Sequence, residues 1–188
     1  MAKLAEAMGV GVMSLYYYFP SKAELLEAAT DRIFSRFSAP EAEVDWESAI
    51  RQWVEAVGRF FLANPLALDL ITRDGRVSPV WLRTSLPMLH ILRRAGFQGP
   101  AFAFAAGWLV NVVMGFVASE RVSFARGEPF LPLLDTLTPV DKALIEDVNL
   151  HFSDAFSTAL VSLVAESVVD GLRRLLSKTD RGELVPWV

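Results

Sequence analysis

The sequence of 188 residues contains no cysteine and only two histidines, His90 and His151. Without cysteine the protein has no disulfide bond, no thiolate metal site and no cysteine nucleophile. The sequence also lacks a glycine-rich nucleotide loop, a G-x-S-x-G nucleophile elbow and an H-E-x-x-H zinc motif. We therefore expect no catalytic residue, no metal site and no cofactor, and we do not expect an enzyme.

Positive charge is not in excess. The 18 lysines and arginines are outnumbered by 22 acidic residues, which gives a net charge of −4. The overall charge therefore attracts neither nucleic acid nor an anionic membrane. No basic region followed by an apolar core opens the chain, so we predict no signal peptide and a cytoplasmic protein.

One segment is long and free of charge. Residues 101–118, AFAFAAGWLVNVVMGFVA, approach the length of a transmembrane helix. The polar Asn111 at its centre and the absence of a flanking basic cluster favour a helix buried on all sides in a soluble oligomer. A membrane protein is the alternative, and purification without detergent would exclude it.

Apolar residues recur at helical spacing almost throughout, and no sustained strand-like alternation is present. The sequence therefore predicts an all-α protein. Residues 38–45, SAPEAEVD, are typical of a linker. We predict a small N-terminal unit with its connecting helix over residues 1–38. A larger helical bundle is predicted over residues 45–178.

Residues 1–38 have the pattern of three short helices. Gly9 ends the first as a C-terminal cap, and Pro20 ends the second because it disfavours the helical state in the residue before it. Ser21 and Glu24 then have the spacing of a capping box, which opens the third helix. A helix, a tight turn and a second short helix form a helix-turn-helix, whose second helix enters the DNA major groove.

Three consecutive tyrosines, residues 16–18, lie in the second of these helices. Successive helical residues are about 100° apart, so Leu15 and Phe19 share the inward face and the tyrosines surround the opposite one. Tyrosine hydroxyls can bond phosphate oxygens, and Lys22 follows at the next helix start, where free amides also favour phosphate. The alternative is that the tyrosines only pack a small helical unit.

The segments LAEAMGV (residues 4–10), LYYYFPSK (15–22) and ELL (24–26) resemble the DNA-binding region of the TetR (tetracycline-repressor-like) family of transcriptional regulators. The resemblance implies a homodimeric regulator, most commonly a repressor, that binds a double-stranded DNA operator under the control of a small-molecule effector. It implies DNA contacts from Val12, Met13, Ser14, Tyr16, Tyr17, Tyr18 and Lys22.

Val12 and Met13 are apolar, although they lie at the start of the helix that is expected to contact the bases. Neither can form bidentate hydrogen bonds with a base, so they could only pack on thymine methyls or other apolar base edges. Val12 has a second possibility, which is to point inward with Leu15.

The family also places one more helix, with a basic arm, before the segment where this sequence begins. We therefore expect an N-terminally truncated DNA-binding unit. Four basic and four acidic residues cancel over residues 1–38, so counterion release would contribute little to DNA binding. The alternative function is a helical ligand-binding dimer that does not bind DNA.

Small residues recur every four positions along the long apolar segment, where another helix can approach closely. The last helix has apolar residues at three- and four-residue steps. Two such helices from each chain would form a four-helix interface, and a symmetric dimer matches a two-fold DNA site. We predict dimer contacts from Ala103, Gly107, Gly115, Leu160, Val164, Val168, Gly171 and Leu172. The alternative is that the glycines only allow close packing within one chain.

Aromatic and methionine side chains occupy the helices that would surround a central cavity. Such walls with a few polar groups suit an apolar or amphipathic ligand. The candidate pocket residues are Trp53, Phe60, Phe61, Trp81, Met88, His90, Trp108, Asn111 and Met114. The alternative is an ordinary core position for each aromatic residue and a surface position for His90.

Overall fold

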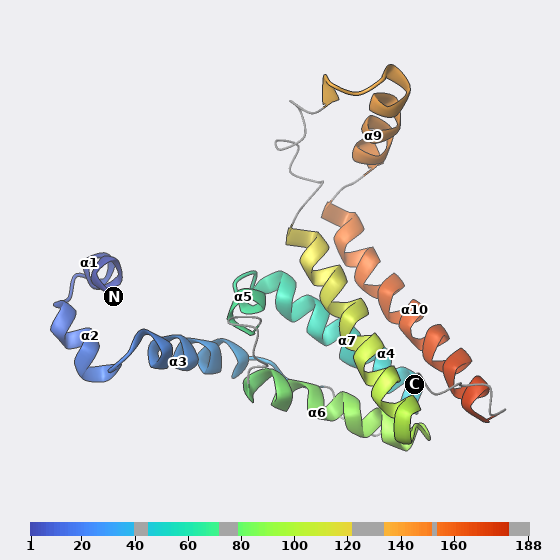
Figure 1. The fold of residues 1–188 in the computed structure, drawn as a ribbon, viewed down its shortest axis with the longest axis horizontal. Helices are drawn as coiled ribbons and strands as arrows, with labels where there is room; N and C mark the ends of the chain where they lie inside the picture. The colour runs from blue at the N-terminus through green and yellow to red at the C-terminus, as the bar shows by residue number, and fades with distance from the viewer. Residues whose placement is uncertain (40–44, 72–78, 122–133, 152–153, 181–188) are drawn as a thin grey trace. The chain divides into compact units, whose positions relative to one another are not determined.

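The computed structural model describes residues 1–39, 45–71, 79–121, 134–151 and 154–180. Over these residues the regular secondary structure is α-helical (Figure 1), which confirms the predicted fold class. The chain divides into two compact units. The first contains residues 1–38 and 66–85, and the second contains residues 39–65 and 86–188. Residues 40–44 of the predicted linker lie outside the described residues.

Short sequence patterns predicted where helices of the first unit begin and end. Gly9 adopts the left-handed conformation, with φ of +66°, and ends the first helix. Ser21 Oγ accepts a hydrogen bond from the Glu24 N–H at 3.1 Å, which confirms Ser21 as the cap of the third helix, and donates one to the Glu24 carboxylate at 3.0 Å. The helices are α1 (Ala2–Met8), α2 (Val12–Tyr18), α3 (Lys22–Phe34), α5 (Ala67–Ile71) and residues 79–85 of α6 (Pro79–Arg94).

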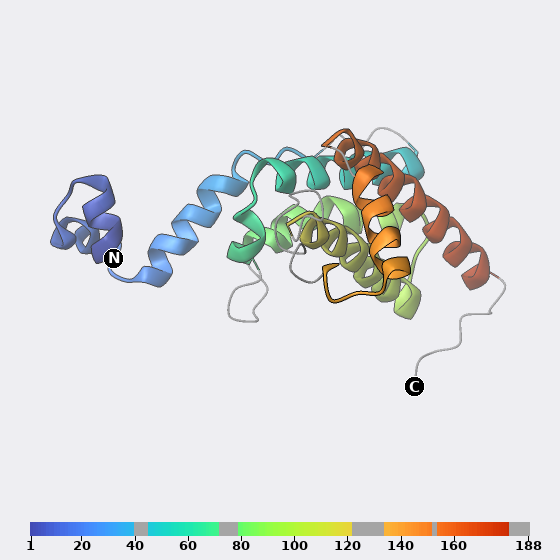
Figure 2. The same ribbon diagram turned by 90° about the horizontal axis from the view of Figure 1, so that it is seen from above.

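The second unit contains the remaining helices: α4 (Trp46–Ala63), residues 86–94 of α6, α7 (Gly99–Arg121), α9 (Pro139–His151) and α10 (Asp154–Asp180). Helices α4, α7 and α10 pack against one another (Figures 1 and 2). Asp45 caps α4, because its carboxylate accepts hydrogen bonds from the N–H groups of Glu47 and Ser48. The three helices bury an apolar core that includes Ile50, Trp53, Val57, Leu109, Val113, Ala165, Val168 and Leu172.

Helices α7 and α10 approach closely at Gly171. A β-carbon at this position of α10 would overlap the indole ring of Trp108 on α7. Gly171 therefore makes room for an aromatic side chain of its own chain. Trp108 packs on α10 at this point.

An exposed ion-pair network joins the start of α4 to α10. The Arg173 guanidinium donates to both carboxylate oxygens of Glu47, at 2.7 and 2.8 Å, and to Asp170 at 2.6 Å. Arg51 makes a second two-pronged pair with Glu166. The hydrogen bonds from Arg173 hold the pKa of Glu47 below its ordinary value, and those from Arg51 do the same for the pKa of Glu166.

This network predicts an acid-sensitive contribution to stability. Both glutamates have lowered pKa values in the folded state, so their contribution is complete above the ordinary pKa of 4.5 and is lost as the pH falls through the folded values. We expect the double variant Glu47→Gln, Glu166→Gln to show a smaller fall in Tm between pH 5 and about pH 3 than the wild type.

The control is Glu146→Gln, which changes an exposed glutamate of α9. It should leave the acid-dependent fall in Tm at its wild-type size. Because the paired side chains are partly exposed, the difference should shrink when salt is added. Identical pH profiles for the double variant and the wild type would contradict the assignment.

Candidate nucleic-acid interface

Helices α1 and α2 contact each other and form a small pair. Ala5 and Leu15 are their buried side chains. Leu15 thus points inward, as its helical position predicted. Phe19, four residues further along, is half-buried. Val12 is exposed, so it lies outward and does not join Leu15. The packing fixes which face of α2 is free.

The free face of α2 is aromatic and apolar. Met13 and Tyr17, four residues apart, are 79% and 82% exposed. Tyr16 and Tyr18 are also exposed, and the Tyr17 and Tyr18 rings meet edge to face with centroids 5.2 Å apart. Ser14 is exposed as well. The tyrosine hydroxyls therefore face solvent in this structure, where they can meet a ligand.

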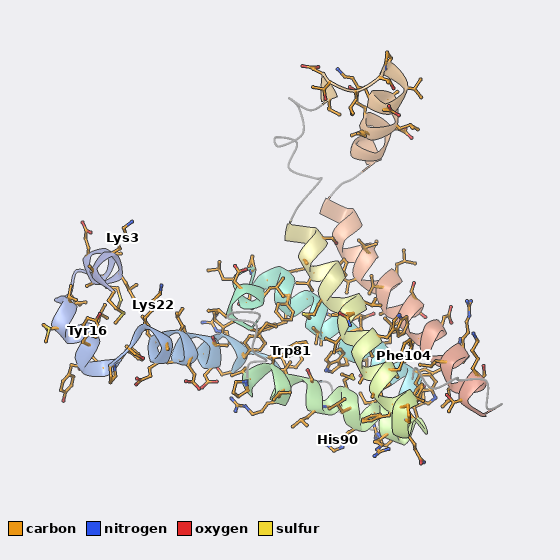
Figure 3. All side chains as sticks on the ribbon, in the orientation of Figure 1. Lys3, Tyr16, Lys22, Trp81, His90 and Phe104 are labelled. Carbon is orange, nitrogen blue, oxygen red and sulfur yellow. The ribbon has the colours of Figure 1, made fainter. Side chains whose placement is uncertain are left out.

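Lys22 is the first residue of α3, directly after the capping Ser21 (Figure 3). Its side chain is exposed, as is that of Lys3 on α1. Figure 3 also shows Tyr16 on the neighbouring α2. The first unit therefore presents an ammonium group and three phenol hydroxyls, all hydrogen-bond donors, on neighbouring helices. No group of three or more His, Asp or Glu side chains among the described residues could hold a metal ion.

The predicted pocket residues differ in burial and are divided between the two units. Trp53, Phe60, Phe61 and Met88 are buried in the second unit, and Trp81 is buried in the first. Trp108 and Met114 are half-buried. The two polar candidates are exposed: His90 on α6 (Figure 3), and Asn111 on α7, where its amide donates to the Gly107 carbonyl at 2.8 Å. Neither lies among the buried aromatics.

One face of α7 is exposed in the described part of the chain. Ala103, Gly107, Asn111 and Gly115 lie along it, and a β-carbon at either glycine would meet no other described atom within 4 Å. Phe104, which is not among the predicted dimer contacts, is also exposed on α7 (Figure 3). The segment Gly99–Ser119 is long and apolar enough to cross a membrane. Only 33% of its most apolar 18 residues are buried inside the protein. The expected burial on all sides is therefore not reached within one chain.

The predicted interface residues of α10 lie further inside. Val168 and Leu172 are fully buried within the chain, Leu160 and Val164 are half-buried, and Gly171 lies against Trp108. Among the described side chains of α10, the large apolar Leu163 is exposed. Of the predicted dimer contacts, Ala103, Gly107 and Gly115 on α7 are therefore the exposed ones.

Comparisons with known proteins agree on the class of protein. The family model described as bacterial regulatory proteins, tetR family, matches residues 1–29. An HTH-type transcriptional repressor of Mycobacterium tuberculosis is 39% identical over 82 residues, which cover 42% of this chain and 31% of that protein. The repressor DrrR1 of Streptomyces coeruleorubidus is 25% identical over 204 residues, 99% of this chain and 73% of that protein. This chain matches less than a third of the length of the Mycobacterium tuberculosis repressor, so the activity of that whole protein is not assigned to this chain.

Solved structures show the same fold. A possible TetR family transcriptional regulator from Streptomyces coelicolor A3(2) superposes with a TM-score of 0.69 at 23% identity, over 92% of this chain and 88% of that one. The TetR family protein ActR of Streptomyces coelicolor, in complex with actinorhodin, superposes with a TM-score of 0.64 at 19% identity, over 93% of this chain and 86% of that one.

Proposed function

We propose that the chain is a member of the tetR family of bacterial regulatory proteins and a DNA-binding transcriptional repressor whose operator binding is controlled by a small apolar or amphipathic ligand. The observation that carries the proposal is the exposed face of α2, which displays Met13 and Tyr17 beside Lys22 of α3. These side chains make no core contact that would explain them as packing residues.

The proposed roles follow from their chemistry. Helix α2 enters the major groove, and the hydroxyls of Tyr16, Tyr17 and Tyr18 bond phosphate or base-edge atoms. The Lys22 ammonium contacts a phosphate. Because α2 carries no charged residue, the exposed lysine and the phenol hydroxyls supply the attraction, and residues 1–38 form the DNA-binding domain.

We propose that two copies of the chain associate through the uncovered face of α7. The stripe formed by Ala103, Gly107 and Gly115 lets a second helix approach closely, and apolar Phe104 adjoins it. A symmetric pair places two copies of α2 on a two-fold operator. Residues 45–178 then form the dimerisation and ligand-binding domain.

The ligand proposal rests on the fold and on composition. ActR is a protein of the same fold that was solved with actinorhodin. In this chain the aromatic residues Trp53, Phe60 and Phe61 give α4 an apolar interior face, which would accept an apolar molecule better than a charged one. The zero net charge of residues 1–38 keeps a second candidate open, a ligand-binding dimer without DNA binding.

Lys22→Gln tests the DNA-binding role. A lysine that contacts phosphate releases about one counterion, so its loss should weaken binding to all duplexes alike and reduce the slope of log K against log [salt] by about 1. The measurement is fluorescence anisotropy over a salt series, with duplexes that the protein selects from a random-sequence library.

Lys3→Gln is the matched control, because Lys3 is the other exposed lysine of the same unit and lies on α1. It should keep the wild-type slope. Equal slopes for the wild type and Lys22→Gln would remove Lys22 from the interface. Failure of the protein to enrich any duplex would contradict the regulator itself and favour the ligand-binding dimer.

A further inference from the structure

The exposed face of α2 lacks every side chain that reads bases by paired hydrogen bonds. Arg or Lys recognises guanine, Asn or Gln recognises adenine, and Asp or Glu accepts from cytosine. Helix α2 has the sequence VMSLYYY and contains none of these. Ser14 offers one hydroxyl, which can bond either type of base and discriminates poorly.

The same helix instead exposes apolar groups. Met13 is 79% exposed, and the aliphatic Val12 beside it is also exposed. Tyr17 lies one helical turn from Met13 on the same face. Burial of a methionine or valine side chain against an apolar group is favourable, and these two residues lie on the helix that is proposed to enter the DNA groove. In the major groove the apolar group available to them is the methyl at C5 of a pyrimidine.

We propose that this protein reads its DNA site through C5-methyl groups of pyrimidines, which are contacted by Met13 with Val12, and not through bidentate hydrogen bonds. The inference rests on the proposed DNA-binding function and adds the chemistry by which the site is chosen. The flexible thioether chain of methionine adapts to a methyl group without a fixed geometry. Thymine is the base that carries this methyl in ordinary DNA, and 5-methylcytosine carries it in methylated DNA.

The test begins with duplexes that the protein selects from a random-sequence library. Each thymine of the selected site is then replaced in turn by deoxyuridine, which removes the methyl and keeps the hydrogen-bonding edge. Burial of one such group corresponds to roughly a fourfold change in affinity. We expect about this loss at the thymines that face Met13, and no loss for the Met13→Ala protein at the same positions.

Met8→Ala is the matched control, because Met8 is an exposed methionine of the same unit on α1. It should keep the wild-type preference for thymine over uracil. Met13→Gln supplies a gain of function, since its amide can bond adenine bidentately. A fresh selection with this variant should replace thymine by adenine at the contacted position. Both changes are at exposed positions, so the fold should be retained.

The outcomes separate the inference from the function it rests on. A selected site that tolerates uracil at every position would overturn the methyl readout and leave the regulator standing. An equal loss with uracil for wild type and Met13→Ala would also overturn it, because another residue would then contact the methyl. If only 5-methylcytosine duplexes are enriched, the methyl readout holds with methylated DNA as its source. Failure to enrich any duplex would overturn both proposals.

Discussion

Replacing Gly115 with arginine is expected to convert the proposed dimer into a monomer and to reduce operator affinity by about 100-fold or more. Gly115 lies on the exposed face of α7, and a β-carbon there meets nothing within 4 Å of its own chain. The single chain therefore tolerates arginine, and the loss of a helical glycine favours the helix by up to about 1 kcal/mol. A second copy against this face would leave the arginine buried without a partner. A monomer loses the avidity of two linked reading helices, which is worth about 10²- to 10⁴-fold.

Sedimentation equilibrium gives the oligomeric state, and anisotropy with the selected duplex gives the affinity. Leu144→Arg is the matched control: it places the same charge at a 63% exposed apolar residue of α9, outside the α7 stripe. The control should remain dimeric. Circular dichroism should show unchanged helix content for Gly115→Arg. A dimeric Gly115→Arg protein with wild-type affinity would show that the copies meet elsewhere.

The second large effect is expected at Trp53, whose side chain is 0% exposed in α4. Helix α4 packs against both α7 and α10, so truncation at this position removes contacts in the middle of the second unit. Trp53→Ala should lower the free energy of unfolding by about 3–5 kcal/mol. Urea denaturation at one fixed protein concentration measures it, because dimerisation makes stability depend on concentration.

The size of this effect separates two roles for Trp53. If Trp53 packs in the core, its truncation should lower the free energy of unfolding by the full amount. If it lines a ligand cavity, it has fewer neighbours and the loss should be smaller. Leu82→Ala is the control at an exposed leucine and should change stability by about 0.5 kcal/mol or less. A Trp53→Ala loss below about 1.5 kcal/mol would favour the cavity wall that the sequence predicts.

Local rules predicted much of the fold. The Ser21 cap of the third helix and the left-handed Gly9 are decided by neighbouring residues, and the structure has both. The inward position of Leu15 followed from the helical repeat alone.

Contacts between residues far apart in the sequence could not be predicted from local patterns. Gly107, Gly115 and Gly171 all have helical spacing suited to close packing, yet the first two face outward and the third lies against Trp108. Only the position of the neighbouring helix distinguishes them. The pair of Arg173 with Glu47 joins residues 126 positions apart, which no local pattern encodes. The exposure of His90 and Asn111, two predicted pocket residues, likewise depends on how whole helices are turned.

The central claim is that the protein recognises a particular DNA sequence. The most direct measurement is competition between a duplex selected by the protein and a scrambled duplex of the same composition. Fluorescence anisotropy monitors the competition at several salt concentrations. The account predicts that the selected duplex binds about 10³-fold or more tightly than the scrambled one, and that both affinities fall as salt rises. Equal affinities for the two duplexes, or no binding by a protein that is folded and dimeric, would contradict it.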